Sequence, residues 1–264
     1  MASNEVPEID IEHANAARIY DYLLGGSHNF AVDRQYATAM LDRIPEIAQV
    51  AYANRTFLQR AVTYCLDTGI DQFLDLGSGI LTVGNVHEIA RRRDPTARVA
   101  YVDIEPVAVA HSRELVADLP TVTITQADLR DVDAVLKAPG VAGLIDFTRP
   151  VAILAVAALH YVSPTDDLVA ILGAYRAVMT AGSALVFSHG SDDFDDPVVA
   201  QNMRAIAEVM RTSATPGYLR SRAELAAALS DFDLVEPGLV DIQRWHSTST
   251  DREAGIYCAV GHSR

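Results

Sequence analysis

Cysteine and positive charge are scarce in this sequence, and each shortage excludes a class of protein. Only two of the 264 residues are cysteines, Cys65 and Cys258, and no cluster of cysteines and histidines resembles a zinc site. We therefore expect free, buried thiols in a cytoplasmic protein and no bound metal. Lysine and arginine number 21 against 35 aspartates and glutamates, which gives a net charge of −14. This balance argues against a nucleic-acid partner and against an anionic membrane surface.

Long apolar stretches are also missing. The longest run, residues 151–159, has about half the length that a membrane-spanning helix needs. The first twenty residues are acidic and have no apolar core, so we expect no signal peptide. Half of all residues are apolar and 21% are charged, a composition typical of a folded globular protein. We therefore expect a soluble protein of the cytoplasm.

Helical patterns fill the first 69 residues, and a different pattern follows. Apolar residues recur at helical spacing near 16–24, 33–44 and 47–67, with Gly69 as a C-terminal cap. Beyond it, short β-branched runs alternate with amphipathic helices, which is typical of a parallel α/β sheet. The expected fold class is α/β, a doubly wound seven-stranded sheet with a late antiparallel strand and an N-terminal helical cap. The predicted strands are residues 72–76, 98–103, 121–126, 151–159, 184–188, 232–243 and 256–261.

A glycine-rich turn follows the first predicted strand. The segment QFLDLGSG runs from an apolar strand through Asp75 to Gly77, Ser78 and Gly79. Glycine lets a backbone turn sharply and come close to a ligand. The next helix, about 83–93, would point its N-terminal amides at that ligand. The pattern therefore favours a nucleotide-type site at the end of this strand.

Two classes of cofactor compete for such a turn. A dinucleotide fingerprint needs a third glycine where this chain has Thr82, and a pyrophosphate would be repelled by Asp75. S-adenosylmethionine instead carries an ammonium and a sulfonium, which a carboxylate at this place would attract. An ordinary tight turn between strand and helix, without any ligand, stays open on this motif alone.

Acidic residues follow the ends of the next two strands as well. Asp103 ends the second strand, where a carboxylate can accept the ribose hydroxyls of an adenosine, and Ile104 comes next. Asp128 follows the third strand and is placed to accept from the adenine amino group, with Leu129 packing on the ring. Either acid alone would also fit a helix N-cap, but in doubly wound sheets ligands bind beyond the carboxyl ends of the strands. The predicted cofactor site comprises Asp75, Gly77, Ser78, Gly79, Asp103, Ile104, Asp128 and Leu129.

With these residues in view, the sequence resembles a known family. The segments ARIYDYLLGGSHNFAVDR, FLDLGSGILTVGNVHEIA, LHYV, SHG and LVEPGLVDIQRW are similar to successive blocks of a bacterial S-adenosyl methyltransferase family, first catalogued as a domain of unknown function. The resemblance extends from about His13 to Cys258. Family members usually carry a proline where this chain has Leu81, and Gly84 precedes Asn85 here. We expect these departures to change the packing of the loop and not cofactor binding.

The resemblance implies a Rossmann-like fold of the class I methyltransferases, with S-adenosylmethionine as the cofactor. Residues 1–69 would form a helical cap and residues 70–264 the cofactor-binding domain, together one compact unit. No particular acceptor is implied; the negative charge disfavours a nucleic acid, so we expect methyl transfer to an unidentified small molecule, while a protein acceptor stays open. A non-catalytic sensor or partner protein that binds the same cofactor is the alternative from another class. A nicotinamide oxidoreductase is disfavoured by Thr82 and Asp75.

Two histidines are candidates for a general base. His160 follows the long apolar run and lies next to Tyr161. An imidazole there that titrates near neutral pH would take a proton from the acceptor. The alternative is a hydrogen-bonded histidine that only lines the pocket. His189, in the acidic segment SHGSDDFDD, is the weaker candidate.

Further candidates lie in the predicted cap. Tyr20, Asn29, Phe30 and Asp33 surround two glycines in a loop that would close over the site. The alternative makes Tyr20 and Phe30 core residues and Asp33 a helix N-cap. Arg55 would pair with the cofactor carboxylate through its planar guanidinium, although a surface role is equally open.

Two more segments are assigned to the site's surroundings. Asn85 and His87 begin the helix after the glycine turn, and Asn85 is predicted to touch the cofactor. Residues 197–219 form an extra helical segment beside the site, either a lid or a plain connection.

Overall fold

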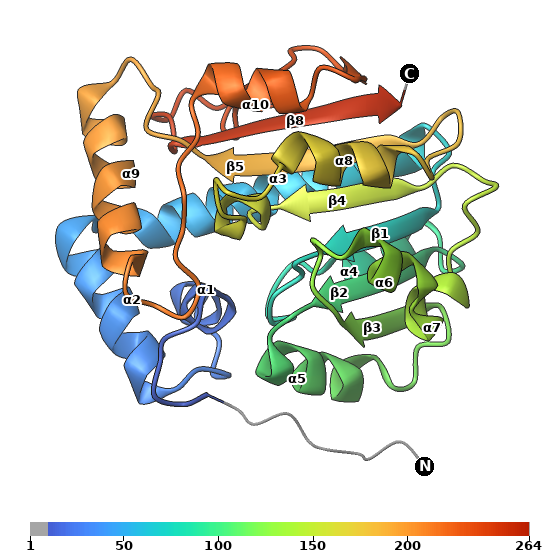
Figure 1. Ribbon diagram of the computed structural model, residues 1–264, viewed down its shortest axis with the longest axis horizontal. Coiled ribbons are helices and arrows are strands. Elements are labelled where there is room, and N and C mark those ends of the chain that lie inside the picture. Colours follow the sequence, from blue (N-terminus) through green and yellow to red (C-terminus); the bar gives the residue numbers. More distant parts are fainter. Residues whose placement is uncertain (1–9, 264) are drawn as a thin grey trace.

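A mixed β-sheet runs through the middle of the molecule, whose computed structural model describes residues 10–263 (Figure 1). Its strands follow the order β3-β2-β1-β4-β5-β8-β6, and β7 pairs with β8. Strands β1 to β5 are parallel, while β8 runs antiparallel to β5, β6 and β7. The predicted doubly wound α/β sheet with a late antiparallel strand is confirmed. The strands are β1 (Gln72–Leu76), β2 (Arg98–Asp103), β3 (Val122–Gln126), β4 (Ala152–Val156), β5 (Ala184–Gly190), β6 (Phe232–Leu234), β7 (Val240–Asp241) and β8 (Ile256–Ser263).

The strand predicted over residues 151–159 is shorter in the structure. β4 stops at Val156 because the next residue, Ala157, adopts a positive φ of 55°. The chain then forms a short 3-10 helix, η1 (Leu159–Tyr161). His160 therefore lies on a helical turn beyond the sheet and not at the end of a strand.

Two other boundaries also differ from the prediction. The strand predicted over residues 232–243 is two short strands, β6 and β7, with Gly238 at a φ of 84° between them. The helix predicted from residue 83 begins at Val86, because Gly84 has a φ of 65° and Asn85 is the N-cap. In both places a glycine with positive φ ends the regular backbone.

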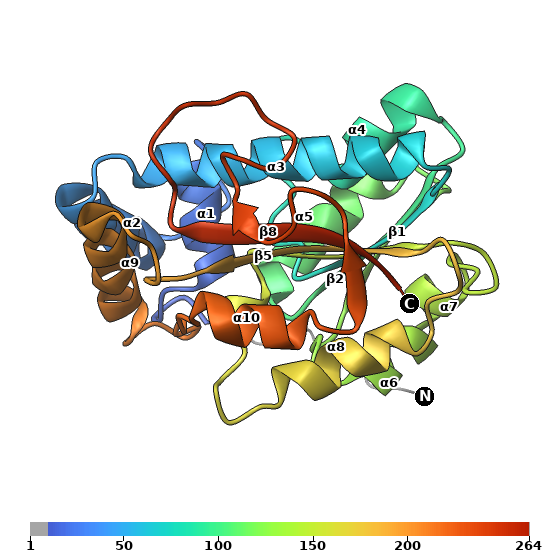
Figure 2. The same cartoon turned by 90° about the horizontal axis from the view of Figure 1, so that it is seen from above.

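Helices cover both faces of the sheet (Figure 2). α3 (Ile47–Asp67) and α4 (Val86–Arg93) lie on one face; α6 (Val132–Lys137), α8 (Leu168–Arg176) and α10 (Arg222–Ala228) lie on the other. Helices α5 (Pro106–Val116) and α7 (Pro139–Ala142) complete the connections. Because both faces are covered, all five residues of β1 are buried, as expected for parallel strands. The strand order reverses between β1 and β4, and in such sheets a ligand crevice lies at that point.

A cap of three helices lies beyond the carboxyl ends of the strands (Figure 1). It joins α1 (Ala16–Leu23) and α2 (Ala31–Arg43) to α9 (Pro197–Met210), which comes from far along the chain. The first turn of α3 contributes Ile47 to this cap, whereas Phe57 and Cys65 of the same helix pack on the sheet. The division into residues 1–69 and 70–264 stays a prediction, and residues 1–9 lie outside the described part.

A buried ion network connects this cap to the sheet. The guanidinium of Arg18, 1% exposed, donates to the carboxylate of Asp33 at 2.8 Å and to that of Glu105 at 2.7 Å. The same guanidinium lies over the ring of Phe30, 5.0 Å from its centroid. Asp33 also accepts from the backbone N–H of Phe30 and so caps α2. Phe30 and Asp33 therefore hold the cap together, but the N-cap of α2 is the half-buried Phe30, and Asp33 lies in the first turn and not at the N-cap as the alternative had it.

A second buried acid, Asp21, lies against Gly26 in the cap loop. Asp21 accepts from the side chains of Asn29 at 2.8 Å and of Thr82 at 2.6 Å. A Cβ atom at Gly26 would lie 1.9 Å from the Asp21 carboxylate, so only glycine fits there. Asn29 is thus a structural residue that ties the cap loop together, while Thr82 ties it to the loop after β1.

Three features of residues 10–263 concern membranes, metals and thiols. No helix in that range has the length and apolar character needed to cross a bilayer. No group of three or more metal-binding side chains is arranged around a common centre there. Cys65 and Cys258 are both free and buried, and burial raises the pKa of Cys65 to about 12.

Candidate functional site

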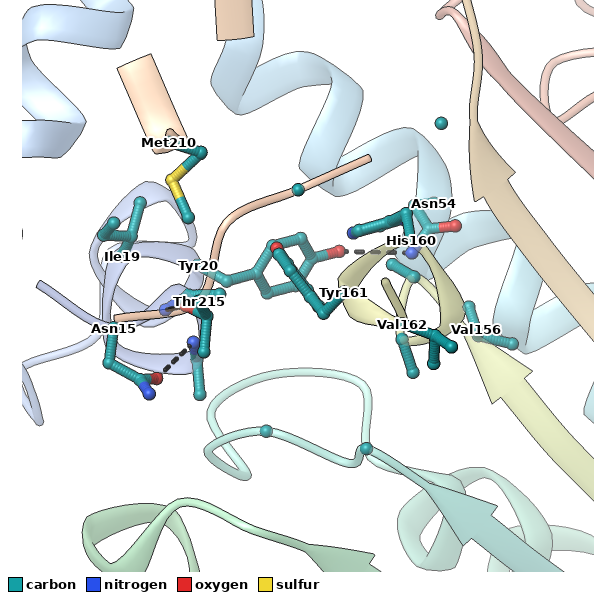
Figure 3. A pocket seen from close by; sticks show the side chains of 18 of the residues that line it. Asn15, Ile19, Tyr20, Asn54, Val156, His160, Tyr161, Val162, Met210 and Thr215 are labelled. Atoms are coloured by element: carbon teal, nitrogen blue, oxygen red, sulfur yellow. Dashed lines mark hydrogen bonds between the residues drawn. The ribbon is translucent and has the colours of Figure 1, made fainter. Parts of the chain in front are cut away.

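A cavity of about 510 Å³ lies between the carboxyl ends of the strands and the cap (Figure 3). Its size is within the range of about 300–1,000 Å³ for small-molecule sites. Almost every residue that the sequence analysis assigned to the cofactor or to catalysis lines it. These are Tyr20, Arg55, Asp75, Gly77, Ser78, Gly79, Asp103, Ile104, Asp128, Leu129 and His160.

The glycine turn after β1 is held open by its own backbone. Gly77 and Gly79 have φ angles of 70° and 64°, in the region that favours glycine. A Cβ atom at Gly77 would lie only 2.6 Å from the Cβ of Ala158, the residue that precedes η1. A glycine is therefore needed here because Ala158 packs against it, and not because a ligand does. At Gly79 the nearest atom to such a Cβ, in Ala17, is 3.9 Å away. The turn is as predicted, but the reason that position 77 needs glycine is different.

Two acidic side chains are buried beside this turn. Asp103 accepts the N–H of Gly79 at 2.6 Å and that of Glu105 at 2.8 Å, which fixes its carboxylate. Burial raises the pKa of Asp103 to about 6. Asp75 makes no hydrogen bond to any residue the structure describes; burial and, less strongly, the charge of Asp103 raise its pKa to about 7, against the lowering by Arg55. The end of the sheet thus holds two carboxylates that gain from a cationic or hydrogen-donating ligand.

Asp128 forms an ion pair that the sequence did not predict. Its carboxylate pairs with Arg130 at 2.6 Å, and this hydrogen bond, with others from Arg130, keeps the pKa of Asp128 below its usual range. Arg130 also reaches Asp166 at 3.2 Å. The pair lies at the half-exposed mouth of the cavity, where a carboxylate oxygen can still accept from a ligand amino group.

Arg55 and Tyr20 face each other across the cap side of the cavity. The guanidinium of Arg55 lies 5.2 Å from the centroid of the Tyr20 ring. Its Nε atom is buried and has no hydrogen-bond partner in the described part of the chain. A buried donor without a partner is costly, so this nitrogen is available for an anionic ligand.

A hydrogen-bond chain fixes the floor between cap and sheet. Tyr20 donates its hydroxyl to the carbonyl of Ala51 at 3.0 Å and accepts from the amide of Asn54 at 3.4 Å (Figure 3). The Asn54 oxygen accepts from Ser188 at 2.9 Å, and Ser188 in turn accepts from the N–H of Ala157 at 2.9 Å. Four elements therefore set the position of Asn54, which lines the cavity.

His160 lines the cavity, but it does not titrate near neutral pH. Burial, with the nearby His189 and Arg220, lowers the pKa of His160 to about 3. Its Nδ1 atom is buried and has no hydrogen-bond partner among residues 10–263. The expected imidazole that titrates near neutral pH therefore does not agree with this burial, which favours the neutral form.

Three other predicted or candidate residues lie outside the cavity. His189 is saturated: Nδ1 contacts the carbonyl of Gly190 at 2.8 Å, and Nε2 contacts Arg220 at 2.9 Å. The backbone N–H of Asn85 donates to Glu88, and His87 bonds the hydroxyl of Tyr101 at 2.8 Å. None of the three is among the lining residues. The assignment of Asn85 to the cofactor site does not agree with its place in the structure.

The chain matches a known protein family over nearly its whole length. The family model described as S-adenosyl methyltransferase matches residues 2–264. The chain belongs to this family. No curated protein matches the sequence of this methyltransferase at a significant level.

Solved structures agree with this assignment. A protein from Thermobifida fusca, described as a candidate methyltransferase, has 36% sequence identity and a TM-score of 0.90, with 100% of each chain covered. A DUF574 family protein from Streptomyces avermitilis has 34% identity and a TM-score of 0.91 over 97% of this chain and 100% of the other. An O-methyltransferase family protein from Burkholderia thailandensis, at 16% identity and a TM-score of 0.54 over 88% and 70% of the two chains, shares the fold.

The family membership fixes the activity and the cofactor of this methyltransferase. It is an S-adenosylmethionine-dependent methyltransferase with the Rossmann-like fold of class I. The expectation drawn from the resemblance is confirmed on both points. Nothing in the comparisons supports a non-catalytic sensor, and they leave the methyl acceptor unidentified.

The extra helical segment predicted beside the site, residues 197–219, provides a wall of the cavity. Met203, Ile206 and Met210 of α9 line it at positions i, i+3 and i+7 of one helix face. Met40 of α2 and Tyr161 of η1 join them. The spacing along α9 is visible in the sequence, but an apolar helix stripe is more often ordinary core, and only the fold shows that it faces a cavity.

The segment after α9 closes one side of the cavity. We call residues 211–219 the strap. The N–H of Ala214 donates to Ala14 at 2.9 Å, and the Thr215 hydroxyl accepts from Ala16 at 2.7 Å. At its other end, the N–H of Tyr218 donates to the carbonyl of His160 at 2.7 Å. The strap thus links the cap to η1 across the site.

Proposed function

We propose that the methionine part of S-adenosylmethionine lies between Asp75 and Arg55. The cofactor carries an ammonium and a sulfonium on this part, together with a carboxylate. A buried carboxylate without a hydrogen bond and a buried guanidinium nitrogen without a partner line one cavity. Two opposite charges held apart in this way complement a zwitterion, and this observation carries the proposal.

The adenosine part is assigned to the ends of β2 and β3. The oxygens of Asp103 each accept one backbone N–H, which leaves lone pairs for the ribose hydroxyls. Ile104 is 54% exposed although it is large and apolar, which suits a residue that packs against a bound ring. Leu129 and Asp128 both line the cavity, and the adenine ring and its amino group are assigned to them.

Catalysis by the chain then consists mainly of positioning and of water exclusion. When bound, S-adenosylmethionine supplies a methyl group to a lone pair of the acceptor. The neutral imidazole of His160 accepts a hydrogen bond from the acceptor and then receives its proton. A hydroxyl oxygen that has just been methylated is an oxonium and therefore a strong acid, so even a weakly basic imidazole can take its proton.

A small molecule is the acceptor in this proposal, in the cytoplasm. The strap is hydrogen-bonded to the cap at Ala14 and Ala16 and to η1 at His160, so it covers one side of the cavity and leaves less room for a folded protein. The net charge of −14 disfavours a nucleic acid. The free, buried thiols of Cys65 and Cys258 suit a reducing compartment.

Calorimetric titration with S-adenosylmethionine tests the site. An ammonium beside Asp75 requires the charged carboxylate. Below the Asp75 pKa of about 7, the carboxyl group must therefore lose its proton for the cofactor to bind. Affinity should therefore fall by up to about tenfold per pH unit between pH 7 and pH 5. Asp75→Asn should bind more weakly at pH 8 and lose that slope, and Arg55→Gln should bind more weakly at every pH.

Asp71→Asn is the matched control, because Asp71 pairs with Arg149 outside the cavity. It should keep both the affinity and the slope of the unaltered protein. If Asp75→Asn bound the cofactor as tightly as the control at pH 8, the assignment of the methionine part to this position would be wrong.

A further inference from the structure

The cavity has a charged side and an uncharged side. All its charged lining residues come from the sheet ends, the turns that follow them, or α3: Arg55, Asp75, Asp103, Glu105, Asp128 and Arg130. By contrast, every described lining residue from α1, α2, α9 and the strap is uncharged. The charges of the cofactor are therefore matched by the charged side only. The second ligand, the methyl acceptor, has to fit the uncharged side.

Methionine and tyrosine dominate the uncharged side. Three of the chain's five methionines, Met40, Met203 and Met210, line it. Figure 3 shows the rings of Tyr20 and Tyr161 in the middle of the cavity, with Met210 to one side. Methionine adapts to irregular shapes, and its sulfur packs well against aromatic rings. Such a wall fits a flat, apolar molecule.

On the wall itself, the polar side chains of Asn15 and Thr215 accept from backbone N–H groups of α1. Further polar groups gather where this wall meets the sheet. His160 and Asn54 lie there, on the opposite side of the tyrosine rings from Met210 (Figure 3). The hydroxyl of Tyr161 makes no hydrogen bond to the described residues, and burial raises the pKa of Tyr161, so it stays a donor. A ligand held by the apolar wall would present one polar group to this place.

We propose that the methyl acceptor is a neutral, mainly apolar molecule with an aromatic ring that carries a hydroxyl or an amine. The ring lies against Met210, Ile206 and Tyr161, and its polar group faces His160. A carboxylate on the ring would have to leave water for a wall without a counter-charge, which is costly. This inference rests on the proposed function, since it needs the cofactor on the charged side.

The transfer balances as follows for a hydroxyl acceptor. An oxygen lone pair forms the bond to the methyl carbon while the carbon–sulfur bond breaks and its electron pair stays on sulfur. The products are a methyl ether and S-adenosylhomocysteine. The hydroxyl proton passes to the imidazole of His160 and from there to water.

Binding measurements test the acceptor class without relying on turnover. The protein is first titrated with S-adenosylhomocysteine, and the loaded protein is then titrated with 2-naphthol or with 6-hydroxy-2-naphthoate. These two probes share one ring system and differ in a carboxylate. We expect the neutral probe to bind at least about tenfold more tightly than the anionic one.

A lysine placed in the wall sharpens the test. Ile206→Lys should weaken binding of 2-naphthol and strengthen binding of the naphthoate, which reverses the preference. Val198→Lys, at a 43% exposed position on the same helix, should leave both affinities unchanged. Circular dichroism of both variants shows whether the helix is retained, and the two-probe comparison on the unaltered protein stands without them.

The outcomes separate the two proposals. If S-adenosylhomocysteine binds but the anionic probe binds as tightly as the neutral one, or neither probe binds, the acceptor class is wrong and the cofactor site stands. If S-adenosylhomocysteine itself fails to bind, the proposed function fails, and this inference fails with it.

Discussion

The two sides of the cavity differ in how they are built. On the sheet side, short loops follow adjacent parallel strands, so Asp75 and Asp103 are brought together by the sheet itself. On the cap side, the wall is assembled from α1, α2, α9 and the strap, which are distant in sequence. The sheet side is polar and fixed by backbone hydrogen bonds, whereas the cap side is apolar and fixed by packing and by one ion network. In the proposed function, the sheet side holds the cofactor and the cap side holds the acceptor, so different parts of the fold would carry the two sites.

Removal of Arg18 should break the connection between the two sides and have the largest effect. Arg18→Met leaves the buried carboxylates of Asp33 and Glu105 without their partner. We expect the free energy of unfolding to fall by about 3–5 kcal/mol, measured by urea denaturation. Arg211→Met, which removes an exposed pair with Glu208, should change it by less than about 1 kcal/mol. Equal losses in the two variants would mean that the network does not hold the cap.

Substitution of the two glycines tests the sheet side alone. Gly77→Val combines a positive φ with a Cβ contact of 2.6 Å to Ala158. We expect a loss of about 3 kcal/mol in unfolding free energy, from backbone strain and overpacking together. Gly79→Ala meets no atom closer than 3.9 Å and should lose only about 1–2 kcal/mol, from strain alone. Thermal denaturation of both variants decides this, and a more stable valine variant would contradict it.

Loss of the Asp103 carboxylate should weaken binding of the cofactor without unfolding the cap side. Asp103→Ala is expected to reduce S-adenosylmethionine affinity by about 1.5–3 kcal/mol, the range for a hydrogen bond to a charged group. Isothermal calorimetry provides the measurement, and Asp71→Asn again serves as the control. An unchanged affinity would remove Asp103 from the site.

The smallest effect is expected at the border of the two sides. Since burial lowers the pKa of His160 to about 3, its imidazole is neutral from pH 5 to pH 8. With the cofactor saturating, turnover should therefore show no fall from His160 protonation in that range. His160→Ala should lower turnover by about tenfold, the equivalent of one hydrogen bond. A turnover that decreases below pH 6.5 in the unaltered enzyme but not in this variant would mean that His160 titrates near neutral pH after all.

The sequence was sufficient where local patterns and neighbouring strands determine the structure. The bounds of β1, β2 and α3 are as predicted, and the turn at Gly77 and Gly79 follows from glycine's freedom at positive φ. The same argument placed Asp75 and Asp103 correctly at the cavity, because adjacent parallel strands end at one edge of a sheet.

The errors arose where a distant partner decides a residue's role. His189 is held by Arg220, 31 positions further along the chain, and no local pattern shows this. Asn85 looked like a ligand because it follows the glycine turn, but it is the N-cap of α4 and does not line the cavity. The stripe on α9 had the spacing of a core helix, and only the packing of the cap shows that it borders an open space.

The ion network of the cap also has a thermodynamic consequence for the cofactor. The carboxylate of Glu105 accepts a hydrogen bond from the guanidinium of Arg18, and the backbone N–H of Glu105 donates to the carboxylate of Asp103. The docked cap and the ribose site therefore share one turn of chain at the end of β2. Coupling between two equilibria is reciprocal. A cofactor that stabilises this turn therefore also stabilises the docked cap. The stabilisation equals the free energy by which the docked cap improves cofactor affinity. If the cofactor binds as proposed, we therefore expect the acceptor wall to be assembled most fully when the methyl donor is in place.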